Sequence, residues 1–179
     1  MISIGKWRDA GFLSYLIKMT YYDEISSGYE ELHREEQLKK IEIIKKYLKV
    51  GPADKLLDVG CGTGLTTEPW DCIRYGADPA PKLLAKARQK DKIKYVLAPA
   101  EKLPFKNRDF DVVISVTAIQ NFQDIEQGLK EIRRVGRDRF VLSFLKRSAK
   151  KNYIIKLIKK LFDVEKVVEE EKDMIYFCV

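Results

Sequence analysis

The stretch LLDVGCGTG, residues 56–64, decides the fold of this chain. Leu56, Leu57 and Val59 form the apolar run expected of a parallel strand that is buried on both faces. Asp58 places a carboxylate near the carboxyl end of that strand, where burial is costly unless something pairs with it. Three glycines at alternate positions then let the backbone turn tightly and approach a ligand closely. We therefore predict a small-molecule pocket here rather than an ordinary tight turn.

Length and composition fit one globular domain, because the 179 residues are 45% hydrophobic and 34% charged. No segment approaches the roughly 20 apolar residues of a membrane span, and the N-terminal stretch lacks a small-residue cleavage site. We therefore expect a cytoplasmic protein without a membrane partner. The three cysteines, Cys61, Cys72 and Cys178, show no CxxC spacing, so we expect neither a disulfide framework nor a metal site.

Apolar periodicity alternates between strand and helix character along the chain, which is typical of an α/β fold with a parallel sheet. Helices are expected at residues 34–49, 80–90, 124–135 and 148–162, the first with Leu38, Ile41, Ile44 and Leu48 on one stripe. Strands are expected at residues 55–60, 72–77, 93–98, 110–116, 139–145, 163–169 and 174–179. The last connection is too short for a parallel crossover, so the final two strands should form an antiparallel hairpin.

Three motifs in order, LLDVGCGTG, GADPAPKLL and AEKLPFKNRDFDVVIS, resemble those of the class I S-adenosylmethionine-dependent methyltransferases. The resemblance runs from about Tyr21 to the end of the sequence. It implies a doubly wound, mostly parallel seven-stranded sheet of order 3-2-1-4-5-7-6, with strand 7 antiparallel and helices on both faces. It also implies a single domain over residues 1–179, in which residues 1–50 cover the cofactor and residues 51–179 form a Rossmann-like core.

The expected cofactor is S-adenosylmethionine, and several residues are candidates to bind it. Asp78 follows Gly60 by eighteen positions, near the spacing at which an acidic residue binds ribose hydroxyls. The alternative for Asp78 is a cap of the next helix. Glu101, which the resemblance places beside the adenine, has the alternative of a solvated loop carboxylate. The full set of candidates is Tyr22, Tyr29, Asp58, Gly60, Cys61, Gly62, Gly64, Asp78, Pro79, Ala100, Glu101, Val116 and Thr117.

Two features distinguish this sequence, one from the dehydrogenase fingerprint and the other from the usual pattern of the methyltransferase family. The glycines read GxGxG, and Leu65 and Thr66 stand where a dehydrogenase fingerprint would have its third glycine, which argues against a nicotinamide or flavin cofactor. Only thirteen residues separate Gly64 from Asp78, and Pro69 is among them, so the helix after the loop should be about one turn long. This shortening could leave one side of the cofactor pocket less closed than in the family.

The segment KMTYYDEISSGYEELH resembles a YDxxAxxYD element in which aromatic residues cover the cofactor. Tyr22 and Tyr29 take the two aromatic positions, and the alternative is that they pack a helix onto the sheet. His33, the only histidine, lies among charged residues and is expected to be a surface residue rather than a general base.

The acceptor side is expected in the run SVTAIQNF, residues 115–122, where Gln120 and Asn121 are candidate substrate residues. No NPPY-type motif follows the fourth strand, which argues against methylation of an adenine amine or a glutamine amide. Methyl transfer chiefly needs alignment of the reacting groups, so no catalytic base is identified.

Residues 130–160 form a basic band, with twelve Lys and Arg against two acidic residues, whereas the whole chain has a net charge of +7. Such a band could follow the phosphates of tRNA or rRNA, or it could be the solvated face of helices. The family resemblance thus implies a methyltransferase whose acceptor the sequence does not identify. RNA is one candidate acceptor, and a small-molecule or protein acceptor and an inactive cofactor-binding subunit are the alternatives. A small activating protein partner is also compatible with it, and the oligomeric state is left open.

Overall fold

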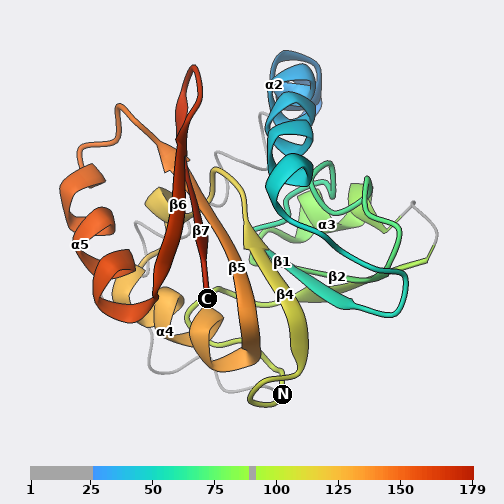
Figure 1. The fold of residues 1–179 in the computed structure, drawn as a ribbon. Coiled ribbons are helices and arrows are strands. Elements are labelled where there is room, and N and C mark those ends of the chain that lie inside the picture. The colour runs from blue at the N-terminus through green and yellow to red at the C-terminus, as the bar shows by residue number, and fades with distance from the viewer. Residues whose placement is uncertain (1–25, 89–91) are drawn as a thin grey trace, which may run out of the picture.

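A computed structural model describes residues 26–88 and 92–179 of the chain, with side chains from residue 34 onward (Figure 1). The helices are α2 (Ser26–Tyr47), α3 (Pro81–Ala87), α4 (Ile125–Val135) and α5 (Lys151–Leu161), with a short 3-10 helix η1 (Ile119–Asn121). The strands are β1 (Lys55–Val59), β2 (Ile73–Asp78), β3 (Ile93–Leu97), β4 (Phe110–Ser115), β5 (Gly136–Leu145), β6 (Val164–Glu169) and β7 (Asp173–Cys178).

The seven strands form one sheet of order β3-β2-β1-β4-β5-β7-β6. Strands β1 to β5 pair in parallel, and β7 is antiparallel to both β5 and β6. The predicted strand order and the terminal hairpin are therefore confirmed. Because the carboxyl ends of β1, β2, β3 and β4 meet at one edge of this sheet, the loops that follow them are neighbours.

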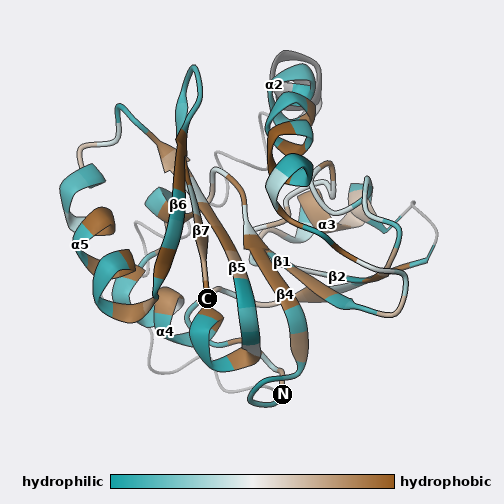
Figure 2. Cartoon of the chain, in the orientation of Figure 1, coloured by the Kyte–Doolittle hydropathy of each residue, from teal (hydrophilic) through white to brown (hydrophobic). Residues whose placement is uncertain are grey.

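Two hydrophobic clusters lie on opposite faces of the sheet. One joins α4 and α5 to the inward side chains of β1, β4 and β5, including Leu129, Ile158 and Phe140. The other joins α2 to the opposite side of β1, β4 and β7 through Ile41 and Ile44. Figure 2 shows this arrangement as hydrophobic stripes on the helices that face the strands. The sheet is thus covered on both faces, as parallel sheets require.

The buried face of α2 differs from the expected stripe at one position. Ile41, Ile44 and Leu48 are buried, but Leu38 is 37% exposed and Lys40 takes a buried position with only 2% exposure. The helix is therefore rotated so that Lys40 rather than Leu38 faces the sheet. A buried ion pair made by Lys40, described below, accounts for this rotation.

The segment after the glycine loop contains no regular helix. Residues 65–69 form turns, in which the amides of Thr67 and Glu68 both donate to the Gly64 carbonyl at 3.1 and 2.9 Å. The expected one-turn helix is therefore reduced to a hydrogen-bonded turn, which agrees with the expected shortening of this segment. None of the helices within residues 26–88 and 92–179 is both long and apolar enough to cross a membrane.

Candidate functional site

The carboxyl edge of the sheet brings the predicted site segments together through backbone contacts. The amide of Gly60 donates to the Ala77 carbonyl at 2.8 Å, which joins the loop after β1 to the end of β2. The Ala98 amide donates to the Asp78 carbonyl at 3.1 Å, which joins the ends of β2 and β3. Ser115 Oγ donates to the Val59 carbonyl at 2.9 Å and joins β4 to β1. Four loops therefore surround one region at the edge of the sheet.

The glycine loop adopts a conformation that side chains disfavour. Gly60, Gly62 and Gly64 have φ values of +78°, +53° and +82°. A Cβ on Gly60 would lie 2.5 Å from the Cβ of Ala118, so this loop passes directly against the segment after β4. A Cβ on Gly62 would meet only Leu83 Cδ1, at 4.0 Å, so the space over the middle of the loop is open. The loop is thus closely packed at Gly60 and leaves space for a ligand at Gly62.

Gly64 has a second reason to be glycine that the sequence did not reveal. Its Cβ would lie 2.2 Å from the hydroxyl oxygen of Tyr95 on β3. The ring of Tyr95 also covers Gly76, whose Cβ would lie 2.7 Å from that ring, and the Tyr95 hydroxyl is buried with no hydrogen-bond partner among the described residues. Tyr95 therefore packs beside the shortened segment after β1, where a longer helix could have closed the loop.

Asp58 is the buried charge of the site. It is fully buried on β1, and its Oδ2 accepts hydrogen bonds from the hydroxyls of Thr66 and Thr67 at 2.6 and 2.7 Å. Its other oxygen, Oδ1, is buried and accepts no hydrogen bond from any described residue. Burial raises the pKa of Asp58 to about 6, although the two threonine hydrogen bonds oppose that shift. An oxygen in this state has an unused capacity to accept a hydrogen bond from a ligand.

Asp78 ends β2 and binds the backbone on both sides of it. Its Oδ2 accepts from the Gly62 amide and its Oδ1 from the Ala80 amide, both at 2.8 Å. The carboxylate thus fixes the glycine loop against Ala80, the N-cap residue of α3, and α3 has no side-chain cap hydrogen bond of the kind considered from the sequence. Each carboxylate oxygen can accept a second hydrogen bond, so ribose hydroxyls remain chemically possible partners.

The remaining candidates beside the glycine loop and after β3 are buried or half-buried in the protein. Ala100 and Cys61 are 5% and 4% exposed, and burial raises the pKa of the Cys61 thiol well above its usual value. Glu101 uses its Oε1 to accept from the amide of Asp124, at the start of α4, at 3.0 Å. Pro79 lies half-buried between Asp78 and α3. Glu101 is therefore held at the start of α4 by a hydrogen bond that is exposed to solvent.

Val116 and Thr117 leave the end of β4 beside the glycine loop. Val116 is buried, and Thr117 has a φ of +56°. Gln120 Nε2 donates to the Thr117 carbonyl at 2.7 Å, whereas Asn121 is exposed. The predicted acceptor-side residues thus follow β4 directly. Tyr22 lies outside the described residues, and so do the side chains of Tyr29 and His33.

Three groups at this edge were not predicted from the sequence. Thr66 and Thr67 bind Asp58, and Tyr95 packs against the loop. Two threonines eight and nine positions after a buried Asp are a usable signal, since their hydroxyls can pair with it. Tyr95 gives no such signal, because its contact with Gly64 joins segments far apart in the sequence.

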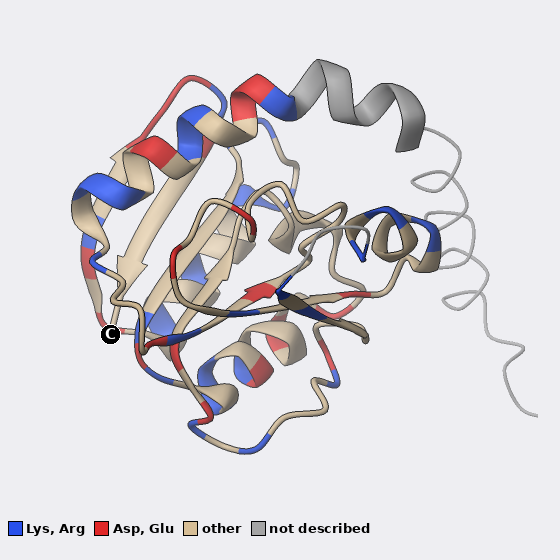
Figure 3. Ribbon diagram, turned by 90° about the vertical axis from the view of Figure 1, so that its right-hand side faces the viewer, with Lys and Arg blue, Asp and Glu red and all other residues tan. Residues whose placement is uncertain are grey.

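Several cations of the basic band pair with carboxylates of the same molecule. Arg134 pairs with Glu131, Lys146 with Glu169, and Lys130 and Lys160 both pair with Glu126. Figure 3 shows Lys and Arg interspersed with Asp and Glu around the molecule. No more than part of the band is therefore available to an external phosphate.

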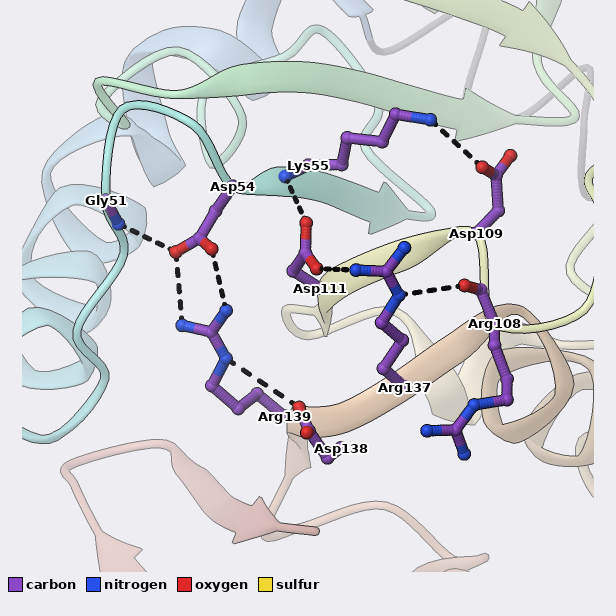
Figure 4. A network of polar contacts seen from close by, with 9 residues as sticks. All are labelled: Gly51, Asp54, Lys55, Arg108, Asp109, Asp111, Arg137, Asp138 and Arg139. Atoms are coloured by element: carbon purple, nitrogen blue, oxygen red, sulfur yellow. Dashed lines mark hydrogen bonds and ion pairs between the residues drawn. The ribbon is translucent and has the colours of Figure 1, made fainter.

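Two further arginines of the band stabilise the amino edge of the sheet, opposite the glycine loop (Figure 4). Arg139 binds both carboxylate oxygens of Asp54, at 2.9 and 3.2 Å. Arg137 pairs with Asp111, whose other oxygen accepts from the Lys55 amide at 2.9 Å. These contacts tie the starts of β1, β4 and β5 together, so Asp111 has a structural role.

Comparison with known proteins supports a methyltransferase domain with this fold. Residues 57–143 match a family model described as a methyltransferase domain. An uncharacterized protein of Methanocaldococcus jannaschii is 34% identical over 126 residues, which cover 69% of this chain and 49% of that protein. The demethylmenaquinone methyltransferase of Chlorobaculum tepidum is 38% identical over 96 residues, 51% of this chain and 40% of that enzyme. The chain spans about half the length of these curated relatives.

A solved structure extends the likeness of fold. A putative methyltransferase of Haloferax volcanii, in complex with the Trm112 methyltransferase activator, superposes with a TM-score of 0.77 at 14% identity. The match covers 88% of this chain and 96% of that one. Among the described residues, no group of three or more His, Cys, Asp or Glu side chains is placed to hold a metal ion.

Proposed function

Because this chain belongs to the class I S-adenosylmethionine-dependent methyltransferases, we propose that it transfers the methyl group of S-adenosylmethionine to an acceptor bound beside the end of β4. One observation carries the proposal most directly. The buried Oδ1 of Asp58 has no described partner, and it lies next to a loop whose three glycines all have positive φ. Such a loop and carboxylate fit a ligand that carries a hydrogen-bond donor.

The residues present fit the family's cofactor. Asp58 Oδ1 would accept a hydrogen bond from the amino group of the cofactor's methionine moiety. The open space over Gly62 would admit the rest of that moiety. Asp78 would hold the ribose hydroxyls while it fixes the loop, and Ala100 with Glu101 would border the adenine. When bound, S-adenosylmethionine supplies an activated methyl group on its sulfonium. The protein then has only to align an acceptor, for which we propose Gln120 and Asn121.

We propose the same assignment for the remaining candidates of the cofactor site. Gly60, Cys61, Gly64 and Pro79 shape the loop and the start of α3, while Val116 and Thr117 border the cofactor from β4. Tyr22 and Tyr29, in the N-terminal cover of the single domain, would close the site.

The acceptor class is the open part of the function. RNA is supported by residues 139–162, which contain Lys and Arg but no acidic residue. A small molecule or a protein side chain is supported by the internal pairing of Arg134, Arg137 and Arg139, which reduces the charge left for phosphates. The intact geometry of Asp58 and the glycine loop argues against an inactive subunit.

Labelled S-adenosylmethionine tests this function. The protein is incubated with it and with fractionated RNA, protein and small-metabolite pools, and Asp58→Asn is the matched control because it keeps the shape of the side chain. We expect label in one pool with the wild-type protein and at least about tenfold less with the variant. Label in RNA would identify the acceptor class as RNA. If the protein binds the cofactor yet labels no pool, the transfer activity is contradicted for the chain alone.

A small activating protein is part of this proposal. The Haloferax volcanii neighbour is described in complex with such an activator, which supports the idea for this fold without identifying a contact here. If the chain alone labels no pool, the same assay with added extract protein of low mass tests whether an activator restores transfer.

A further inference from the structure

A buried ion pair lies at the carboxyl edge of the sheet, next to the proposed site. Lys40 of α2 and Asp173 at the start of β7 have side-chain exposures of 2% and 0%, and Lys40 Nζ is 3.1 Å from Asp173 Oδ1. Two charges removed from water are costly unless they are paired and also satisfied by hydrogen bonds. The surroundings of the pair should therefore show what it holds in place.

The pair surrounds Thr117. Lys40 Nζ donates to the hydroxyl of Thr117 at 2.9 Å, and that hydroxyl donates to Asp173 Oδ2 at 2.6 Å. Ser143 of β5 completes the group: its hydroxyl donates to Asp173 Oδ2 at 3.0 Å and accepts from the Thr117 amide at 2.8 Å. Both the side chain and the backbone of Thr117 are thus fixed by residues of α2, β5 and β7.

Thr117 needs such support because its backbone is strained. Its φ of +56° lies in the left-handed region, which β-branched residues rarely adopt. The strain occurs directly after β4, where the next residue, Ala118, packs against the position of a Cβ on Gly60. The direction in which the chain leaves β4 at Thr117 therefore sets how residues 118–121 lie against the glycine loop.

We propose that Lys40 and Asp173 are positioning residues that hold Thr117 in its left-handed conformation and so fix residues 117–121 over the methyl-transfer site. Neither residue is a catalytic residue, since both are enclosed by the protein. The pair also makes the geometry of the acceptor side depend on the docking of α2, because Lys40 is the residue through which α2 reaches Thr117. The role of this pair at a methyl-transfer site rests on the proposed function. The effect of the pair on the conformation of residues 117–121 can be measured without any ligand.

Hydrogen exchange in the ligand-free protein tests the coupling. The double variant Lys40→Met with Asp173→Asn removes both charges together, and Lys39→Met, on an exposed position of α2, is the matched control. We expect amides of residues 117–122 to exchange about tenfold faster in the double variant, with those of β1 and β4 unchanged. Exchange equal to that of the control would overturn the proposal.

Thr117→Gly separates positioning from general stabilisation. Glycine adopts a φ of +56° without strain, so removal of the pair should accelerate exchange less than about threefold in the Thr117→Gly background. The same acceleration in both backgrounds would show that the pair merely stabilises the fold and would overturn the proposal. If the double variant does not fold, Ser143→Ala is used in its place, because it removes the acceptor of the Thr117 amide while leaving both charges.

Binding of S-adenosylhomocysteine, measured by calorimetry, gives the second readout. We expect the double variant to bind it about tenfold more weakly than Lys39→Met does, since Thr117 borders the proposed cofactor position. An affinity equal to that of the control would contradict the link to the site. If the wild-type protein does not bind this probe, the proposed function fails, whereas the exchange measurements still decide whether the pair positions Thr117.

Discussion

Asp58 combines two properties that rarely occur together in a purely structural carboxylate. It is fully buried, yet one of its oxygens is left without a described hydrogen bond. Thr66 and Thr67 stabilise the ionised form through the other oxygen, while burial destabilises it. These opposing effects give Asp58 a pKa of about 6. A positively charged amino group bound beside Asp58 would favour the ionised form of its carboxyl group.

Cofactor affinity should consequently depend on pH through Asp58. Its pKa is raised to about 6, so the carboxylate is ionised at pH 7 and protonated at pH 5. We expect S-adenosylhomocysteine to bind several-fold more weakly at pH 5 than at pH 7.5, because the protonated group no longer attracts an ammonium. Calorimetry over this range measures the effect, and Asp58→Asn should lack it. An identical pH dependence in that variant would contradict the role of Asp58.

The raised pKa of Asp58 affects folding stability in the opposite direction to cofactor affinity, because stability falls as the pH rises. The folded-state pKa of Asp58 lies above the ordinary value of 3.8, so the group favours folding below pH 3.8. That contribution is lost as the pH rises through about 6. A binding site that requires the ionised carboxylate therefore works in the pH range where this residue contributes least to folding.

Gly64 should tolerate no side chain. We expect Gly64→Ala to lower the free energy of unfolding by about 2–4 kcal/mol, through its positive φ and the collision with Tyr95. Tyr95→Phe should change stability by less than about 1 kcal/mol, since it removes a buried hydroxyl that has no described partner. Urea denaturation of both variants and their combination measures the coupling. If Tyr95→Phe recovers none of the loss, the collision is not its cause.

Among the helices, α4 does more than cover the sheet, because it holds the loop between β3 and β4. Arg134 donates to the carbonyls of Leu103 and Phe105 at 3.0 and 2.8 Å, and Glu131 accepts from the Leu103 amide at 2.9 Å. This loop, residues 98–109, contains Ala100 and Glu101, two candidates for the adenine end of the site. Arg134 and Glu131, which we call the α4 clamp, therefore stabilise a loop that contains no helix.

Loss of the contacts made by Arg134 should lower the free energy of unfolding by a measurable amount. We expect Arg134→Met to lower the free energy of unfolding by about 2 kcal/mol, because several carbonyls and Glu131 lose a charged donor. Arg134→Lys should lose most of the same amount, since an ammonium cannot reproduce the planar fork of donors. Arg147→Met, at an exposed position, is the control in urea denaturation. Equal stability of Arg134→Met and the control would refute the clamp.

The secondary structure and the terminal hairpin were predictable because each element carries its own signal, whereas the strand order followed from the resemblance of three motifs to a known family. The apolar runs of β1 and β4, the alternation of strands with helices, and the short connection before β7 each act over a few residues. The rotation of α2 was not predictable in this way. It depends on Lys40 meeting Asp173, 133 positions later in the sequence, and on Thr117 between them. Tyr95 and Gly64 present the same difficulty.

The charge of the entire chain illustrates the limit of composition. The sequence showed a basic band, but Arg134, Arg137 and Arg139 are used to join α4 and β5 to neighbouring segments. A cation paired with a carboxylate of the same molecule contributes less to the external field than an unpaired one. Only the arrangement of all elements distinguishes a phosphate-binding surface from a set of internal ion pairs, and this is why the acceptor is less well defined than the cofactor.

The central claim is that the glycine loop and Asp78 hold S-adenosylmethionine, and titration calorimetry tests it most directly. We expect the wild-type protein to bind the cofactor with a dissociation constant on the order of micromolar. Asp78→Ala should show no measurable binding, since the ribose partner and the Gly62 anchor are both lost, while Asp71→Ala, at an exposed position, binds like the wild type. No heat from the wild-type protein, or unchanged affinity in a folded Asp78→Ala, would contradict the account.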